Sequence, residues 1–286
     1  MGNADSKIFN DCCDCNGFGI YNSLSLDAVE NALEDLASRE RIIAYMSKRG
    51  TVFYEVNENY DPAYAMFNNK TNAKKFSEDY FLYRLNQWNT PIPFPIAYPK
   101  RIKLKDAFVV TADGTYEAKL IKQLDNKDLY LHIRCNNFSI SKNKSKTKHY
   151  YPDIIFYTKD GYIGIIEVKP MFDMCDNKVR RKYDLLANFC EQKGFLYTMC
   201  DFQYHTYDFM MTREVNEYLE SLVEETIDDF GAFTQKDFEE FASGKDSKTK
   251  KKYRNQLAAL AIQKNYSVTI HSQKKKYNFV IRKKKK

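Results

Sequence analysis

Residues 149–170 read HYYPDIIFYTKDGYIGIIEVKP, two apolar runs with charged residues at their outer ends. Two apolar runs are separated by Lys-Asp-Gly at 159–161, a combination typical of a tight turn between antiparallel strands. Asp153 stands at the start of the first run, and Glu167 and Lys169 stand at the end of the second. The second run is apolar at consecutive positions, which is typical of a strand that is buried on both faces. Because unpaired charges in such a strand are costly, we expect something to compensate them.

Strand geometry predicts that these three charged side chains meet. Side chains two residues apart share one face of a strand, so Glu167 and Lys169 lie on the same face. The hairpin returns Asp153 toward Glu167, which places two carboxylates and an amine at one edge of a sheet. Carboxylate oxygens suit Mg²⁺ or Mn²⁺. A bound metal activates water, and the lysine could orient or deprotonate that water or stabilise a phosphoryl transition state. The alternative is a structural hairpin with a cross-strand Glu–Lys pair.

The rest of the chain predicts a mixed α/β sheet followed by a mostly helical segment. Asp113-Gly114 is a turn signal between two expected strands, and Gly194 is a helix stop. The expected helices are 24–48, 72–88, 179–193, 215–229, 235–242 and 248–264. The expected strands are 107–111, 116–123, 129–133, 153–157, 162–169, 195–199, 266–271 and 277–282.

Composition and charge narrow the class of protein. A hydrophobic content of 43% is enough for a folded core, and no apolar stretch approaches the ~20 residues that span a membrane. The net charge is +7, but residues 245–286 alone carry +14, which leaves −7 for the first 244 residues. A basic C-terminal end on an acidic body predicts contact with a polyanion. A solvated lysine tail is the alternative.

Cysteine usage predicts reduced thiols and a cytoplasmic protein. The seven cysteines are odd in number, and nothing at the start of the chain resembles a signal peptide. Cys12, Cys13 and Cys15 form a cluster without a fourth ligand at the spacing of a zinc site, so we expect free thiols there as well.

The motif resembles that of a known nuclease superfamily. Tyr-Pro-Asp, thirteen residues and then Glu-Val-Lys-Pro, followed by a basic helix and a Gly-Phe-Leu-Tyr-Thr strand, resembles the PD-(D/E)XK nuclease signature. Within it, the chain is most similar to TnsA-type transposon endonucleases over roughly residues 72–286. The resemblance implies an α/β restriction-endonuclease-like core at 72–212 and a winged-helix-like domain at 213–286. Residues 1–71 then form an N-terminal helical or irregular extension without a counterpart.

The resemblance also implies a set of catalytic residues. Asp153 and Glu167 would bind the metal, and Lys169 would assist the attacking water. Such nucleases add an acid from the helix before the sheet, and Glu78 is the candidate here, as catalytic residue and metal ligand. Its alternative is a helix-start carboxylate, which any helix favours. Glu117 is a poorer candidate because it falls within an expected strand.

Basic side chains in two places are candidates for DNA contacts. One group lies at the start of the expected helix 179–193. The other group lies on the expected recognition helix and on the wing of the C-terminal domain. A solvated helix face is an equally good explanation for any single residue of the first group. The candidates are Lys178, Arg181, Lys182, Lys250, Lys251, Lys252, Arg254, Lys274, Lys275 and Lys276.

Together, these features predict a Mg²⁺-dependent DNA endonuclease. The resemblance implies cutting at transposon ends with a partner transposase and an ATPase. Alternatives are a stand-alone phage or defence nuclease, of the resolvase or head-completion type, and a non-catalytic winged-helix regulator. The oligomeric state is open, with a homodimer among the options.

Overall fold

The computed structural model describes residues 42–46, 52–56, 64–88, 96, 98–135, 138–141, 149–273 and 276–284. The chain divides into two compact units, Met1–Ala65 and Met66–Lys286, and each is considered by itself. None of the helices in these described ranges is long and apolar enough to cross a membrane. Cys12, Cys13 and Cys15 lie outside the described residues, as do Lys274 and Lys275.

The first unit contains a two-stranded antiparallel ribbon. Strand β1 (Ile42–Met46) pairs with β2 (Val52–Val56). The expected helix at 24–48 is therefore wrong over its last part, because Ile-Ile-Ala-Tyr-Met is rich in β-branched and aromatic residues and finds a partner strand of the same kind. The earlier part of that expected helix lies outside the described residues.

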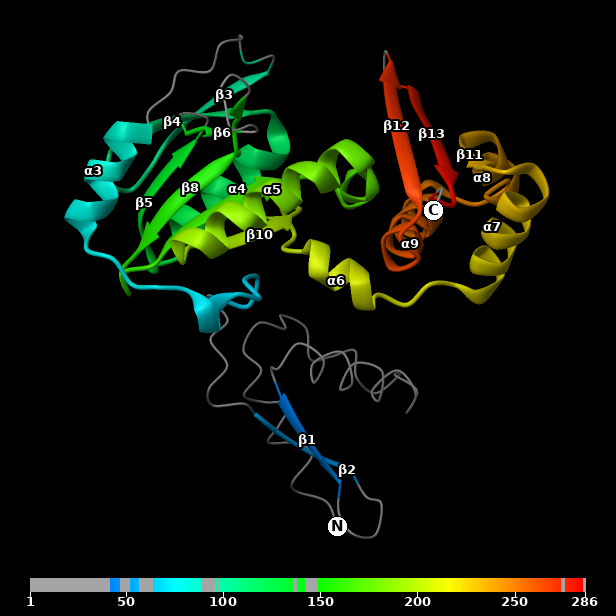
Figure 1. The fold of residues 1–286 in the computed structure, drawn as a ribbon, viewed down its shortest axis with the longest axis horizontal. Coiled ribbons are helices and arrows are strands. Elements are labelled where there is room, and N and C mark those ends of the chain that lie inside the picture. Colours follow the sequence, from blue (N-terminus) through cyan, green and yellow to red (C-terminus); the bar gives the residue numbers. More distant parts are fainter. Residues whose placement is uncertain are drawn as a thin grey trace. The chain divides into compact units, whose positions relative to one another are not determined.

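The second unit is built on a mixed four-stranded sheet, as the sequence predicts for the α/β class (Figure 1). The strand order is β10-β9-β8-β5, with β9 and β10 parallel and the other pairs antiparallel. The hairpin 154–168, the helix after it and the strand 196–200 are confirmed. The strands are β5 (Tyr130–Cys135), β8 (Ile154–Thr158), β9 (Ile163–Val168) and β10 (Leu196–Cys200).

Helices flank this sheet. Helix α5 (Asn177–Lys193) contacts β9 and β10, and α4 (Thr115–Asn126) contacts β5. Helix α3 (Glu78–Trp88) begins six residues later than expected, after a short turn η2 (Lys70–Asn72). Two small ribbons accompany the sheet: β3 (Pro99–Lys103) with β4 (Val109–Asp113), and β6 (Ile140–Ser141) with β7 (His149–Tyr150).

The expected strand at 116–123 is wrong, because these residues form α4. Leu120, Ile121 and Leu124 are fully buried, and their i, i+1, i+4 spacing gathers them on one side of a helix. Gly114 is still a chain reversal, with φ +92°, but it joins a strand to a helix instead of two strands. Residue 117 therefore lies in the first turn of a helix.

The C-terminal part combines four helices with a small sheet of order β11-β13-β12. The predicted helices and the predicted hairpin are confirmed; helix α6 and strand β11 were not predicted. The elements are α6 (Tyr207–Thr212), α7 (Glu217–Phe230), β11 (Phe233–Thr234), α8 (Gln235–Phe241), α9 (Ser247–Gln263), β12 (Ser267–Gln273) and β13 (Lys276–Arg282).

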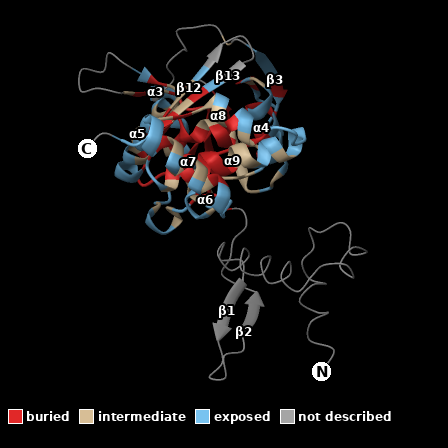
Figure 2. Ribbon diagram, turned by 90° about the vertical axis from the view of Figure 1, so that its right-hand side faces the viewer, coloured by how far each residue is buried: buried red, intermediate tan, exposed pale blue. Residues whose placement is uncertain are grey.

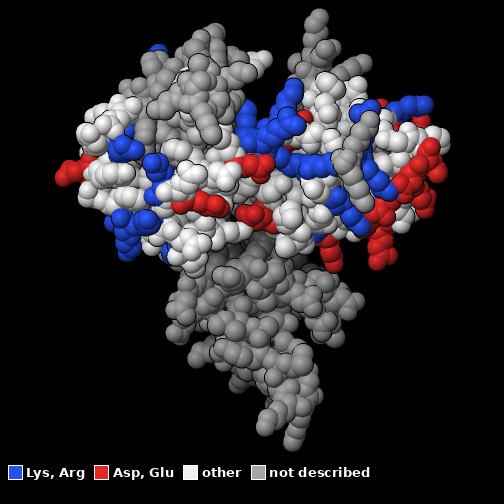
Figure 3. Space-filling view, in the orientation of Figure 1, with Lys and Arg blue, Asp and Glu red and all other residues white. Residues whose placement is uncertain are grey.

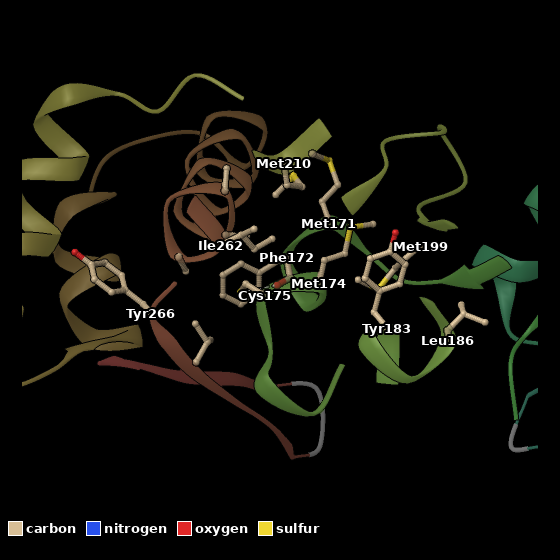
Figure 4. Close-up of a cluster of buried hydrophobic side chains, with 14 of the residues drawn as sticks. Met171, Phe172, Met174, Cys175, Tyr183, Leu186, Met199, Met210, Ile262 and Tyr266 are labelled. Atoms are coloured by element: carbon tan, nitrogen blue, oxygen red, sulfur yellow. Dashed lines mark hydrogen bonds between the residues drawn. The ribbon is translucent and has the colours of Figure 1, made fainter. Parts of the chain in front are cut away.

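One hydrophobic core connects the C-terminal part to the sheet. The turn η3 (Met171–Cys175) packs between α5 and α9, and Figure 4 shows Phe172 near Ile262 of α9 and Met174 on the side of Tyr183. Residues 256–262 of α9 are all buried, and Figure 2 shows the buried residues gathered around this helix. The domain boundary at 212/213 therefore stays a prediction from the sequence. Residues on both sides of it belong to one hydrophobic core.

Polar contacts strengthen this junction at the start of α5. Asp176 caps α5 by accepting from the backbone N–H groups of Lys178 and Val179, and its second oxygen accepts from Ile270 N of β12 at 2.8 Å. Arg180 donates to the Tyr266 carbonyl at 2.7 Å. Both side chains are buried, so the start of α5 and the β12 strand are held together through hydrogen bonds that are shielded from water.

Candidate active site

The β8–β9 hairpin positions two carboxylates opposite each other. Ile154 pairs with Ile166 in the antiparallel register, so one step further along the ladder Asp153 faces Glu167. The hairpin turn depends on Gly161, which has φ +90° and lies so close to the chain that a Cβ would stand 3.0 Å from the Phe76 carbonyl oxygen. The turn residue thus fixes the register that brings the two acids together.

Lys169 joins these carboxylates, as the sequence predicts. Its Nζ lies 2.7 Å from Glu167 Oε1 and 3.2 Å from Asp153 Oδ2, and it donates to the Val168 carbonyl at 2.9 Å. The backbone N–H of Lys169 donates to Cys200 O at 3.0 Å, which continues the parallel pairing with β10. Three oxygens therefore surround one ammonium group at the edge of the sheet.

Burial and mutual charge shift the pKa values of the residues in this cluster. Glu167 is 1% exposed and Asp153 is 9% exposed. Burial, and then the neighbouring charge of Glu167, raise the pKa of Asp153 to about 6, although Lys169 and the Val168 N–H at 2.6 Å oppose the shift. Burial by itself would lower the pKa of Lys169, but Asp153 and Glu167 outweigh it and raise that pKa above its ordinary value. Lys169 is therefore a cation at neutral pH.

A tyrosine holds the second oxygen of Glu167. The Tyr150 hydroxyl donates to Glu167 Oε2, and burial followed by the Glu167 charge raises the pKa of that hydroxyl well above its ordinary value. Lys182 of α5 lies with its Nζ 5.7 Å from the centre of the Tyr150 ring. This contact places one of the predicted DNA-binding side chains beside the cluster.

Glu117 is the acid that sequence reasoning passed over. It stands in the first turn of α4, is 7% exposed, and accepts from the Asp113 backbone N–H at 2.7 Å. Burial, and then the charge of Asp153, raise the pKa of Glu117 to about 8. It is thus a third buried carboxylate whose ionisation is affected by the charge of Asp153, and it stands in a helix where a strand was expected. The helical spacing of Leu120, Ile121 and Leu124 was the signal that could have found it.

Glu78, the acid that was predicted to complete the site, lies elsewhere. Its Oε1 is 2.6 Å from His132 Nε2, and His132 pairs with Tyr157 in the sheet. Tyr157 is four residues from Asp153 along the chain, a distance of roughly 13 Å in a strand. Helix α3 therefore places Glu78 toward the opposite end of β8, and the expectation that Glu78 joins Asp153 and Glu167 is corrected.

The donor set at the cluster fits a hard divalent cation. Within the described ranges, no three His, Cys, Asp or Glu side chains are gathered as a ready-made metal site. Mg²⁺, however, usually binds through one or two carboxylates and keeps several waters. Asp153, Glu167 and the Val168 carbonyl supply only oxygen, and all three already surround the cationic Lys169 Nζ. Donor chemistry and local charge thus agree with Mg²⁺ or Mn²⁺.

The predicted DNA-binding residues occupy three kinds of position. Lys178 and Arg181 on α5 are exposed, as are Lys250, Lys251 and Lys252 on α9. Arg254 is half-buried, with its guanidinium 5.4 Å from the Phe238 ring and 5.7 Å from the Phe172 ring. Lys276 is described only as backbone at the start of β13.

Figure 3 shows a group of Lys and Arg side chains near the centre of the view, with Asp and Glu side chains beside and below it. Arg180 lies between the predicted DNA contacts Lys178 and Arg181 in the sequence. It does not share their exposure, because it is buried and donates a hydrogen bond to the Tyr266 carbonyl, so it is not a candidate for DNA contact.

Comparisons with known proteins add no family. A scan against protein-family models gives no match, and a search of curated proteins finds none similar to this chain. Functional inference therefore rests on the motif, the geometry and the charges of the site.

Proposed function

We propose that this chain is a metal-dependent DNA endonuclease with a PD-(D/E)XK core. The observation that carries the proposal is the convergence of Asp153, Glu167 and Lys169 at the ends of two buried strands. A structural ion pair needs only one acid and one base, whereas this cluster buries two acids on one lysine, and the charge of Asp153 also acts on the buried Glu117. Clustered acids with shifted pKa values are typical of functional sites.

Each residue of the cluster has a distinct part in the proposed reaction. Asp153 and Glu167 would hold Mg²⁺ or Mn²⁺, together with the Val168 carbonyl. A divalent cation bound there supplies a water of lowered pKa and neutralises charge on the phosphate. Lys169 is fully protonated at neutral pH, so it stabilises the charge on the attacked phosphate or the nucleophile. The alternative in which Lys169 deprotonates the water is disfavoured.

Glu117 takes the place that was expected for Glu78. With a pKa of about 8 it carries a proton at pH 7 while no cation is bound, and it would ionise when a cation binds nearby. A protonated carboxyl can also donate a hydrogen bond to a phosphate or water.

The C-terminal part would hold the DNA. The α8–α9 pair followed by the β12–β13 hairpin supports the winged-helix-like assignment, and α9 carries exposed lysines on its N-terminal half while its C-terminal half is buried. Such lysines bind phosphates and give salt-dependent affinity. The resemblance to TnsA-type enzymes favours cleavage at transposon ends with a transposase and an ATPase as partners.

Nicking of supercoiled plasmid in Mg²⁺ or Mn²⁺ tests the proposal. We expect Asp153→Asn and Lys169→Met to lower the rate at least about 10²-fold. Asp160→Asn and Lys159→Met are the matched controls, because both residues are exposed in the turn of the same hairpin. These controls are expected to cut like the wild type.

Two outcomes would contradict the proposal. Cutting that survives in Asp153→Asn and Lys169→Met would assign the activity to another site. DNA binding that is unchanged by EDTA, together with no divalent-cation binding and no cutting, would favour the non-catalytic regulator.

A further inference from the structure

A pocket of about 240 Å³ lies beside the candidate active site. Its wall includes Pro170, which follows Lys169, and Tyr116, which precedes Glu117. It also includes Asp173 of η3, whose carboxyl is close enough to Lys169 to be affected by its charge. The pocket is therefore lined by chain neighbours of Lys169 and Glu117, and one of its carboxylates senses the charge of Lys169.

The cations of this pocket lack carboxylate partners. Arg213, Lys251 and Arg254 line it, and among the described residues none of the three has a carboxylate oxygen within 4.0 Å. Among the residues that the structure describes, the Arg213 guanidinium contacts the Met171 thioether at 3.9 Å and the face of the Phe209 ring. Arg254 Nε is buried without a hydrogen-bond partner in the described part of the chain. A buried unpaired donor of this kind is costly unless a ligand satisfies it.

The acids of the pocket do not cancel these cations. Asp201 is already engaged, because it accepts from the His205 ring at 3.0 Å and from the backbone N–H groups of Gln203 and His205. Asp173 has one oxygen that is buried without a partner among the described residues. Asp173 can thus accept a hydrogen bond from a ligand, while three cations are free to meet an anion.

An aromatic pair completes the pocket. Tyr116 and Phe202 pack edge to face with ring centroids 4.9 Å apart, and both line the cavity. Phe202 is half-buried, and Lys119 Nζ lies 4.6 Å from the centre of its ring, which adds another cation beside the aromatic pair. Aromatic side chains beside a basic groove are typical of sites that stack a nucleobase and hold its phosphate.

We propose that this pocket binds the nucleotide next to the phosphodiester that is cut. The base would pack on the Tyr116–Phe202 pair, and the phosphate would be bound by Lys251 and Arg254. The position of this nucleotide beside the cut rests on the proposed function, whereas its binding rests on the pocket alone. The inference assigns Lys251 and Arg254 to a defined subsite, where sequence reasoning saw only a basic helix.

Isothermal titration of the full chain in EDTA with a 5′-phosphorylated thymidine dinucleotide tests the subsite. We expect Lys251→Gln and Arg254→Gln each to weaken binding about tenfold, the usual effect of losing one hydrogen bond to a charged group. Phe202→Leu should weaken it as well. Lys245→Gln is the matched control, because Lys245 is exposed, lies just before α9 and does not line the pocket. Circular dichroism on each variant confirms that it is folded.

Three results would overturn the subsite. They are absence of dinucleotide binding to the wild type, equal weakening by Lys245→Gln and Lys251→Gln, and equal affinities for inorganic phosphate and the dinucleotide. The last result would mean that the pocket binds an anion and that the nucleobase contributes nothing to the affinity.

The same variants separate this inference from the nuclease proposal. If the wild type does not cut DNA but its dinucleotide binding needs Lys251 and Arg254, the nucleotide pocket stands and the nuclease fails. If cutting needs Asp153 while Lys251→Gln binds the dinucleotide like the Lys245→Gln control, the nuclease stands and the subsite fails.

Discussion

Replacing Glu117 by glutamine should make the metal-free protein more stable at pH 8 while leaving it nearly unchanged at pH 5. Burial and the charge of Asp153 raise the pKa of Glu117 to about 8, from an ordinary value near 4.5. The folded state therefore binds a proton that the unfolded state releases between these two pH values. For an acid with this direction of shift, the free energy of unfolding falls as the pH rises.

The size of this effect follows from the shift. Each pH unit between the two pKa values is worth ~1.4 kcal/mol, so Glu117 should cost the wild type roughly 3 kcal/mol between pH 5 and pH 8. Glutamine keeps an oxygen that can accept from the Asp113 N–H, but it cannot ionise. The variant should thus be about 3 kcal/mol more stable than the wild type at pH 8 and within ~1 kcal/mol of it at pH 5.

Urea unfolding in EDTA at pH 5, 6, 7 and 8 measures this difference. Glu225→Gln on α7 is the matched control, because Glu225 is exposed, and it should not change the pH dependence. A Glu117→Gln variant whose stability runs parallel to the wild type, or falls below it at pH 8, would refute the burial of a protonated acid at this position.

Three further predictions concern the packing and the boundaries of the site. Gly164→Ala should lower the free energy of unfolding, measured in urea, by at least about 2 kcal/mol, because its Cβ would lie 2.1 Å from Cζ of the buried Phe156. Adding Phe156→Leu to this variant should recover part of the loss, and a Gly164→Ala variant as stable as the wild type would contradict this packing. Asp176→Ala should cost about 2–3 kcal/mol in thermal unfolding, since one side chain caps α5 and bonds to Ile270, and a loss well under 1 kcal/mol would show that the two contacts are not made together. Glu78→Gln should cut plasmid within about twofold of the wild type, and a loss of ~10²-fold would return Glu78 to the catalytic set.

The hairpin and its charges were predictable because local signals agree. Lys-Asp-Gly marks a turn, the flanking runs are apolar, and alternation along β9 places Glu167 and Lys169 on one face. Helix α5 was equally clear, since Gly194 adopts the left-handed conformation, with φ +74°, that ends a helix. Such elements need no tertiary information to be recognised.

Glu117 was missed because the sequence around it fits both the two-residue alternation of a strand and the spacing of a helix. Tyr116, Ala118 and Leu120 alternate like a strand, while Leu120, Ile121 and Leu124 follow a helix. Burial of the second set selects the helix, and this choice moves Glu117 from an expected strand to a helix start near Asp153. The decision depends on packing against the sheet, which no local pattern contains.

Other features of the site depend on contacts between distant segments. Arg180 sits in a basic run of the kind that contacts phosphates, yet its partner is the Tyr266 carbonyl, 86 residues away. The pocket beside Lys169 likewise combines residues of η3, the segment after β10 and α9. Spacing along the chain carries no signal for either feature, so both required the folded structure.

Calorimetric titration of Mg²⁺ and Mn²⁺ into the metal-free protein tests the central claim most directly, because it needs neither DNA nor a partner protein. We expect the wild type and Asp160→Asn to bind one of these cations with similar affinity. Asp153→Asn and Glu167→Gln should lose that binding while remaining folded. Absence of binding by the wild type, or equal affinities in all four proteins, would contradict a metal-dependent site at Asp153 and Glu167.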